Sequence, residues 1–167
     1  DREGITGIKY ISFMNIRVAH EKKGCAEKIL PFLKDGESIY NTLLVSKPGA
    51  GKTTCLRDCI RSLSNGKEGW EGMKICVVDE RSEIAACHLG IPQNDMGIRT
   101  DVLSGCGKSE GMMLMLRSMS PQIIAVDELG GKKDFQAVEQ AACSGVRILG
   151  TVHADTAVSY THLTLPT

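Results

Sequence analysis

The sequence contains few aromatic residues, because Trp, Tyr and Phe together make up only 4% of its 167 positions. A base-stacking surface of the kind that binds single-stranded nucleic acid is therefore not expected. Net charge is also missing, since 20 Lys and Arg side chains balance 20 Asp and Glu side chains. This balance removes the global basic footprint of nucleic-acid-binding proteins, and no nucleic-acid partner is predicted.

Long apolar runs are absent as well. No uninterrupted apolar run approaches the ~18 residues that a membrane-spanning helix needs, and no signal-peptide pattern is visible. The chain starts at Asp1 rather than at Met, which indicates an N-terminus that has been cut. We therefore expect a cytoplasmic protein without a membrane span of its own.

The seven cysteines form no C-x-x-C pair, and their number is odd. No pair has the spacing of zinc ligands, so a structural zinc site is not predicted. Cys55 and Cys59 lie four residues apart on a predicted helix, which suits core packing, and Cys76 lies in an apolar run. We interpret the cysteines as reduced, mostly buried thiols of a cytosolic protein.

A phosphate-binding loop is the strongest feature that the sequence does contain. An apolar run at 41–45 precedes a Gly- and Pro-rich turn, and a helical pattern follows at 52–63. This is the strand–loop–helix context of the pattern G-x-x-x-x-G-K-[ST]. Gly49 and Gly51 lack Cβ atoms, so successive backbone N–H groups can surround phosphate oxygens. Ser46 replaces the first Gly of the pattern, and a small residue there should preserve the loop.

The loop assigns roles to three side chains. Lys52 is placed to reach the β- and γ-phosphates, and the Thr53 hydroxyl to hold Mg²⁺. Thr54 is a candidate contact to the α-phosphate. The predicted nucleotide-binding residues are Ser46, Lys47, Pro48, Gly49, Ala50, Gly51, Lys52, Thr53 and Thr54.

Three further apolar segments, at 74–78, 123–126 and 146–152, are predicted to be buried strands. Polar residues directly follow each of them. Because the carboxyl ends of parallel strands meet at one edge of a sheet, where ligands bind in α/β folds, we expect these side chains to converge.

The pair Asp127 and Glu128 after an apolar strand resembles a Walker B element. Asp127 is predicted to hold Mg²⁺, and Glu128 to orient or deprotonate the attacking water. Glu80 is a second candidate catalytic carboxylate, and its alternative role is to cap the start of a helix. His153 is a candidate γ-phosphate sensor or polar link to the nucleotide, although a lone histidine is more commonly structural.

Helical periodicity predicts helices at 25–33, 109–119 and 135–143, whereas residues 84–107 show no regular pattern. Strands that alternate with helices predict an α/β fold, a three-layer P-loop NTPase with a mainly parallel sheet. Arg17, Arg99 and Arg117 are candidates for an arginine that completes a neighbouring subunit's site.

The predicted domain organisation has three parts. Residues 1–38 are predicted to be a partial N-terminal domain and linker, and residues 39–155 a P-loop ATPase domain that is truncated at its C-terminus. Residues 156–167 are predicted to be a non-native or disordered tail, because the end of the chain resembles a translated sequencing-adapter string.

Five segments together resemble the stage III sporulation protein AA family, over approximately residues 8–153. They are SKPGAGKTT, VVDERSEIA, GIRTDVL, GMMLMLRSMSPQIIAVDELG and GTVHAD. That family is similar to the secretion and pilus ATPases, which are RecA-like motors. In those relatives the first Asp-Glu pair corresponds to an "Asp box" and Thr-x-His to a "His box". The resemblance therefore makes Glu80 and Glu128 competing candidates for the catalytic carboxylate, and His153 the box histidine.

The resemblance also implies a function. It implies a cytosolic, Mg²⁺-dependent ATPase that powers a channel complex between mother cell and forespore, as a hexamer beside membrane-channel proteins. Two alternatives remain open from the residues themselves. One is a P-loop small-molecule or nucleotide kinase, and the other is a structural subunit that binds a nucleotide without turnover.

Overall fold

The computed structural model of the chain describes residues 10–14, 16, 21–67 and 69–154. Its elements, in chain order, are α1 (Leu30–Leu33), β1 (Lys34–Asp35), β2 (Ser38–Ile39), β3 (Thr42–Ser46), α2 (Lys52–Asn65), β4 (Ile75–Asp79), β5 (Thr100–Ser104), α3 (Lys108–Met119), β6 (Ile123–Val126), α4 (Lys132–Cys143) and β7 (Arg147–His153).

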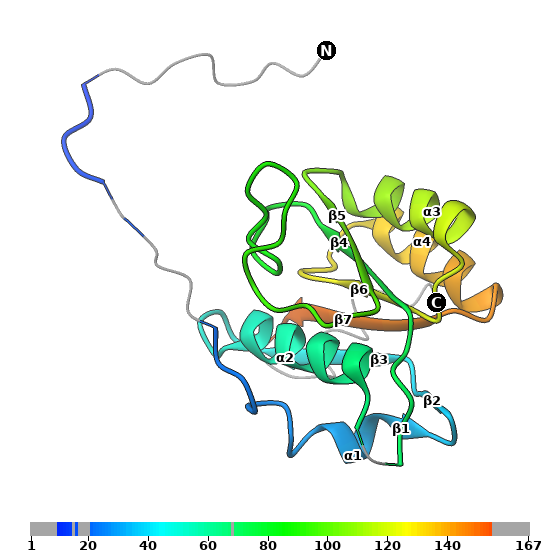
Figure 1. The fold of residues 1–167 in the computed structure, drawn as a ribbon. Helices are drawn as coiled ribbons and strands as arrows, with labels where there is room; N and C mark the ends of the chain where they lie inside the picture. Colours follow the sequence, from blue (N-terminus) through cyan, green and yellow to red (C-terminus); the bar gives the residue numbers. More distant parts are fainter. Residues whose placement is uncertain (1–9, 15, 17–20, 68, 155–167) are drawn as a thin grey trace.

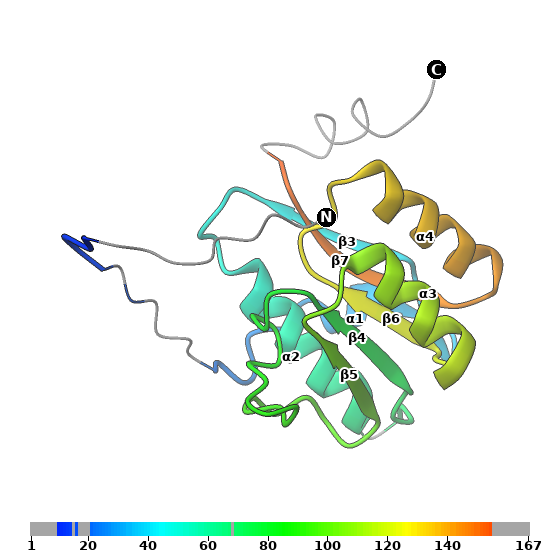
Figure 2. The ribbon, with the colours of Figure 1, turned by 90° about the horizontal axis from the view of Figure 1, so that it is seen from above.

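The centre of the molecule is a five-stranded sheet in the order β3-β7-β6-β4-β5. All neighbouring strands are parallel, and the register pairs Ser46 of β3 with His153 of β7. The carboxyl ends of all five strands therefore lie along one edge of the sheet. Helix α2 covers one face, while α3 and α4 lie side by side on the other (Figures 1 and 2).

The sheet separates two hydrophobic clusters. Along β4, Ile75 and Val77 face the cluster that contains α2, whereas Cys76 and Val78 face the cluster under α3 and α4. Strand β6 alternates in the same way. Such continuous burial on both faces explains why these strands are apolar at every position, as the sequence predicted for parallel strands.

The segment before β3 packs beneath α2. Ala26, Leu30, Leu33 and Ile39 are buried in the same cluster as the apolar face of α2. Of the helix predicted at 25–33 only the last turn, α1, forms, and residues 23–29 are in turns. Pro31 lies in the first turn of α1, where its missing N–H is tolerated but where a longer helix could not pass through it.

Strand β5 was not predicted, because it lies in the segment that shows no regular sequence pattern. It is an edge strand, and each of its five residues is only partly buried. The residues between β4 and β5 form a long loop that protrudes beside the sheet (Figure 1).

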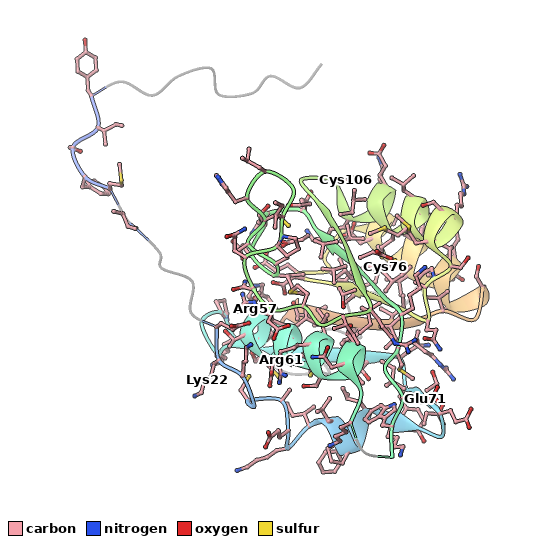
Figure 3. All side chains as sticks on the ribbon, in the orientation of Figure 1. Lys22, Arg57, Arg61, Glu71, Cys76 and Cys106 are labelled. Atoms are coloured by element: carbon pink, nitrogen blue, oxygen red, sulfur yellow. The ribbon has the colours of Figure 1, made fainter. Side chains whose placement is uncertain are left out.

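Two side chains anchor the first part of this loop. Asp79, which is 2% exposed, accepts backbone hydrogen bonds from Glu83, Ile84 and Ala85 at 2.8–3.1 Å. Arg57 of α2, labelled in Figure 3, donates to the Ile84 carbonyl at 2.6 Å and to the Glu83 carbonyl at 2.7 Å. The tip of β4 is thereby held in place.

Candidate functional site

The phosphate loop connects β3 to α2 as the pattern predicts. Gly49 and Gly51 have positive φ angles of 76° and 85°, a region that L side chains rarely adopt. Gly51 is the N-cap of α2 and has no side chain to bond the first backbone N–H groups. These N–H groups and the helix dipole suit an anion such as phosphate.

Lys52 folds back over this loop. Its Nζ donates to the carbonyls of Ser46 and Lys47 at 2.7 and 2.9 Å, and lies 3.2 Å from Ser46 Oγ. It also lies 3.0 Å from Nδ1 of His153. Although only 8% of the residue is exposed, its ammonium lies directly over the loop that precedes α2. Ser46, at the position of the first Gly in the pattern, therefore takes part in the site.

Thr53 and Asp127 meet beside the loop, with Thr53 Oγ1 donating to Asp127 Oδ2 at 2.7 Å. The two residues are 74 positions apart in the chain, and it is the sheet order that brings them together. Both offer oxygen atoms, the ligand type that Mg²⁺ prefers. The chemistry of this pair thus fits a Mg²⁺ ion.

Thr151 is the threonine of the Thr-x-His pattern, to which the sequence alone assigned no role. Its hydroxyl is fully buried, donates to Asp127 Oδ1, and accepts the backbone N–H of Glu128 at 2.9 Å. It precedes His153 by two residues on β7, so both side chains lie on one face of that strand. The two-residue spacing alone predicts that Thr151 and His153 share a face. It does not predict contact with Asp127 and Glu128, which requires β7 to be adjacent to β6.

A single histidine, His153, connects Glu128 to Lys52. Nε2 of His153 is 2.9 Å from Glu128 Oε1, while Nδ1 faces the Lys52 ammonium. Because an ammonium can only donate, Nδ1 is the acceptor and Nε2 carries the proton that is given to Glu128. The hydrogen bond from His153, with Arg81 2.7 Å from the other carboxylate oxygen, holds the pKa of Glu128 below its ordinary value.

Glu80 occupies a different part of the strand-end edge. Its Oε2 accepts a hydrogen bond from Lys108 Nζ at 2.7 Å, and 41% of its side chain is exposed. No helix begins between β4 and β5, where every residue is described, so the role of helix cap considered for Glu80 is not realised, and the preceding Asp79 instead holds the turn after β4. The structure therefore brings Lys52, His153 and Glu128 into contact and leaves Glu80 beside them, bonded to another cation.

Two of the three candidate arginines, Arg99 and Arg117, lie away from this cluster. Arg99 is exposed and precedes β5, and Arg117 is exposed near the end of α3, so both are at the edge opposite the strand carboxyl ends. Arg17 lies outside the described residues, as does the predicted tail at 156–167.

The cysteines are all free, but the prediction that most are buried was wrong. Cys59 and Cys76 are buried, four others are partly exposed, and Cys143 is exposed. Within the described part of the chain, no group of three His, Cys, Asp or Glu side chains has a metal-binding arrangement. Among the described residues, no helix combines the length and apolar character that crossing a bilayer requires.

Comparison with protein families adds to this picture. A sequence model described as "Sporulation stage III, protein AA" matches residues 1–161. The chain is 47% identical over 150 residues to stage III sporulation protein AA of Bacillus subtilis (strain 168), covering 90% of this chain and 48% of that protein. It is 34% identical to the uncharacterized protein ycf45 of Cyanidium caldarium, over 74% of this chain and 36% of that protein. The chain thus spans about half, or less, of the length of these relatives.

Solved structures resemble the fold at lower identity. The ATPase DotB of Legionella pneumophila matches 86% of this chain and 39% of its own, with a TM-score of 0.64 and 19% identity. The pilus retraction motor PilT matches 87% of this chain and 40% of its own, with a TM-score of 0.61 and 21% identity. These similarities confirm the predicted α/β class and its RecA-like, three-layer architecture.

Proposed function

Because the chain belongs to the sporulation stage III protein AA family, we propose that it is the ATP-hydrolysing part of a Mg²⁺-dependent motor. One observation carries the proposal: the phosphate-loop lysine, a strand-end histidine and a strand-end glutamate form one continuous hydrogen-bonded series. Lys52 contacts His153 at 3.0 Å, and His153 contacts Glu128 at 2.9 Å. An anion that binds to Lys52 is therefore linked to the candidate catalytic carboxylate through two side chains, Lys52 and His153.

The residues divide the work as follows. The loop N–H groups and Lys52 bind the phosphates of ATP and neutralise their charge. Thr53 and Asp127 are the residues that would hold Mg²⁺, which supplies further charge neutralisation when bound. Glu128 orients a water molecule and accepts its proton, and His153 holds the Glu128 carboxylate in place. Preorganised groups of this kind are the main source of catalysis in phosphoryl transfer.

We favour Glu128 over Glu80 as the catalytic carboxylate. Glu128 follows Asp127 directly and is linked to Lys52 through His153, whereas Glu80 is bonded to Lys108 farther along the edge.

A phosphate-release assay without any acceptor molecule tests the proposal. We expect wild-type protein to release phosphate from Mg·ATP, and Glu128→Gln to lower the rate at least about 100-fold while nucleotide binding persists. Lys52→Ala should lose both. Phosphate transfer only in the presence of a second substrate would instead indicate a kinase. Binding that is abolished by Lys52→Ala, with no turnover in any variant, would indicate a structural subunit.

At the level of the assembly, we propose a cytoplasmic hexamer that energises a sporulation channel at a membrane between mother cell and forespore. Family membership supports this, and the exposed Arg99 and Arg117 are available to reach a neighbouring copy. Sizing the full-length protein with and without a non-hydrolysable nucleotide tests it. A monomer under both conditions would contradict the hexamer.

A further inference from the structure

Charged side chains alternate in sign along the carboxyl ends of β5, β4 and β6. Lys108, the first residue of α3 after β5, lies 2.7 Å from Glu80 Oε2. Arg81 Nη1 lies 2.7 Å from Glu128 Oε2. Glu80 and Arg81 are consecutive residues at the tip of β4, and they reach in opposite directions because β4 lies between β5 and β6.

At the Glu80 end of this arrangement the cation is mostly buried, although 41% of the Glu80 side chain is exposed. The Lys108 side chain is only 15% exposed, and a Cβ on Gly107 would lie 4.0 Å from Glu80 Oε1. The Glu80 carboxylate therefore sits at the N-terminus of α3, where both the lysine and the helix dipole favour a negative charge.

The Arg81 end is weak by comparison. The Arg81 side chain is 62% exposed, and exposed ion pairs contribute little to stability. A competing carboxylate in the same cleft would easily draw the guanidinium away. The cleft is lined by Val78, Asp79, Glu80, Arg81, Glu83, Lys108, Asp127 and Glu128.

We propose that Lys108 is a positioning residue for the reaction, because it binds Glu80 and so keeps that carboxylate from capturing Arg81. Arg81 then remains on Glu128 and fixes one carboxylate oxygen while His153 fixes the other. The inference rests on the proposed function in giving Glu128 the catalytic role. It assigns to Lys108 an effect on catalysis without contact to the nucleotide or the water.

A double-mutant cycle separates this role from a simple loss of charge or fold. Lys108→Met should lower kcat for phosphate release about five-fold, with KM for Mg·ATP nearly unchanged. Lys108→Arg should restore most of the rate, since it keeps a cation for Glu80. In a Glu80→Gln background, where the competing carboxylate is gone, Lys108→Met should cost less than about two-fold.

Lys132→Met is the matched control, because Lys132 is the exposed first residue of the neighbouring helix α4. It should leave kcat unchanged, and Lys108→Gln replaces Lys108→Met if that variant does not fold. An equal loss of kcat from Lys108→Met in both backgrounds would overturn the proposal, as would a loss that appears only in KM.

A second readout does not depend on turnover. The ¹⁵Nε signal of Arg81, identified by its loss in Arg81→Lys, should move in Lys108→Met and return in Lys108→Met/Glu80→Gln. An Arg81 signal that is unmoved in Lys108→Met would refute the proposal even if the protein hydrolyses ATP. Absence of phosphate release by the wild type, together with the expected Arg81 shifts, would reject the proposed function and retain the ion-pair arrangement.

Discussion

At the scale of single residues, Lys52 shows how the loop before α2 suits an anion. Its ammonium is surrounded by two loop carbonyls, one hydroxyl and a histidine nitrogen. Every one of these partners is neutral, so the positive charge is hydrogen-bonded but not cancelled. A polyanion that enters the loop therefore gains a charge–charge interaction that the protein itself does not provide.

Asp58 is the residue whose charge state should matter most for stability. Its buried carboxylate accepts the Ala26 N–H at 2.8 Å and two hydrogen bonds from Arg61, which is labelled on α2 in Figure 3. Burial alone would raise the pKa of Asp58, but the hydrogen bonds from Ala26 and Arg61 outweigh it and hold the pKa below its ordinary value.

The sign of the pH dependence follows. A lowered carboxylate pKa gives stability that is complete above the unfolded value of about 3.9 and is lost as pH falls through the folded value. We predict that Asp58→Asn lowers the free energy of unfolding at pH 7 by about 1–3 kcal/mol and flattens its decline below about pH 4. Urea unfolding at several pH values measures this, with the more exposed Asp101→Asn as control. Equal pH profiles for wild type and Asp58→Asn would contradict it.

Thr151 leads to a second prediction at this scale. Thr151→Val keeps the shape of the side chain but leaves the buried Glu128 N–H and Asp127 carboxylate each with one hydrogen bond fewer. We expect a loss of about 1–3 kcal/mol in unfolding free energy and a Mg²⁺ requirement for phosphate release that is raised about ten-fold. Thr151→Ser, which retains the hydroxyl, should stay close to wild type. A Thr151→Val protein that matches wild type in both measurements would show that the hydroxyl does not hold Asp127.

Sequence reasoning predicted the proximity of those candidate site residues that carry their own local pattern. Lys52 and Thr53 follow the glycines of the loop, and Asp127 and Glu128 follow an apolar run, so their proximity could be predicted from strand ends alone. The Thr-x-His pattern contains Thr151 but did not reveal its contacts, and Lys108 lies in no pattern that was used for prediction. Each acts on a side chain from another strand, and the sequence does not specify which strands are neighbours.

At the level of elements, α3 approaches the sheet closely because Gly111 has no side chain. A Cβ on Gly111 would lie 2.5 Å from Val78 Cγ1 and 3.4 Å from Leu103 Cδ2. Helix α3 therefore packs closely against β4 at Val78. Val78 is the last apolar residue of β4, and Glu80 and Arg81 follow directly after that strand.

Gly111→Ala should consequently destabilise the protein, although alanine is the better helix former. We predict a loss of about 1–3 kcal/mol in unfolding free energy from overpacking, and a smaller combined loss than the sum of the single changes when Val78→Ala is added. Gly130→Ala, where the nearest atom to a Cβ is 4.0 Å away, is the control. A gain of about 1 kcal/mol for Gly111→Ala, as helix propensity alone would give, would contradict the close packing.

The predicted elements were most accurate where burial is complete. Strands β4 and β6 are buried at every residue, and their apolar runs were predicted to within about one position. Strand β5 is partly exposed at all five residues, so its sequence TDVLS carries no continuous apolar signal. Its existence follows from pairing with β4 rather than from its own composition.

At the scale of the whole molecule, the five parallel strands place the candidate site residues at one edge, between two packed helical layers. The three-layer α/β class could be predicted because alternating strands and helices leave few other arrangements. The order of the strands and the extent of the N-terminal packing could not, since both depend on contacts between distant segments. The chain spans about half of its Bacillus subtilis relative.

Equilibrium titration of ATP, with Mg²⁺ present or removed by EDTA, tests most directly whether the strand ends and the loop form one triphosphate site. We predict that ATP binds saturably to the wild type and that removal of Mg²⁺ weakens this binding. Lys52→Ala should weaken it at least about ten-fold. Asp127→Asn should lose the difference between the two conditions, because Asp127 is the residue that would hold the metal. Binding that is equally tight in wild type and Lys52→Ala would contradict the account.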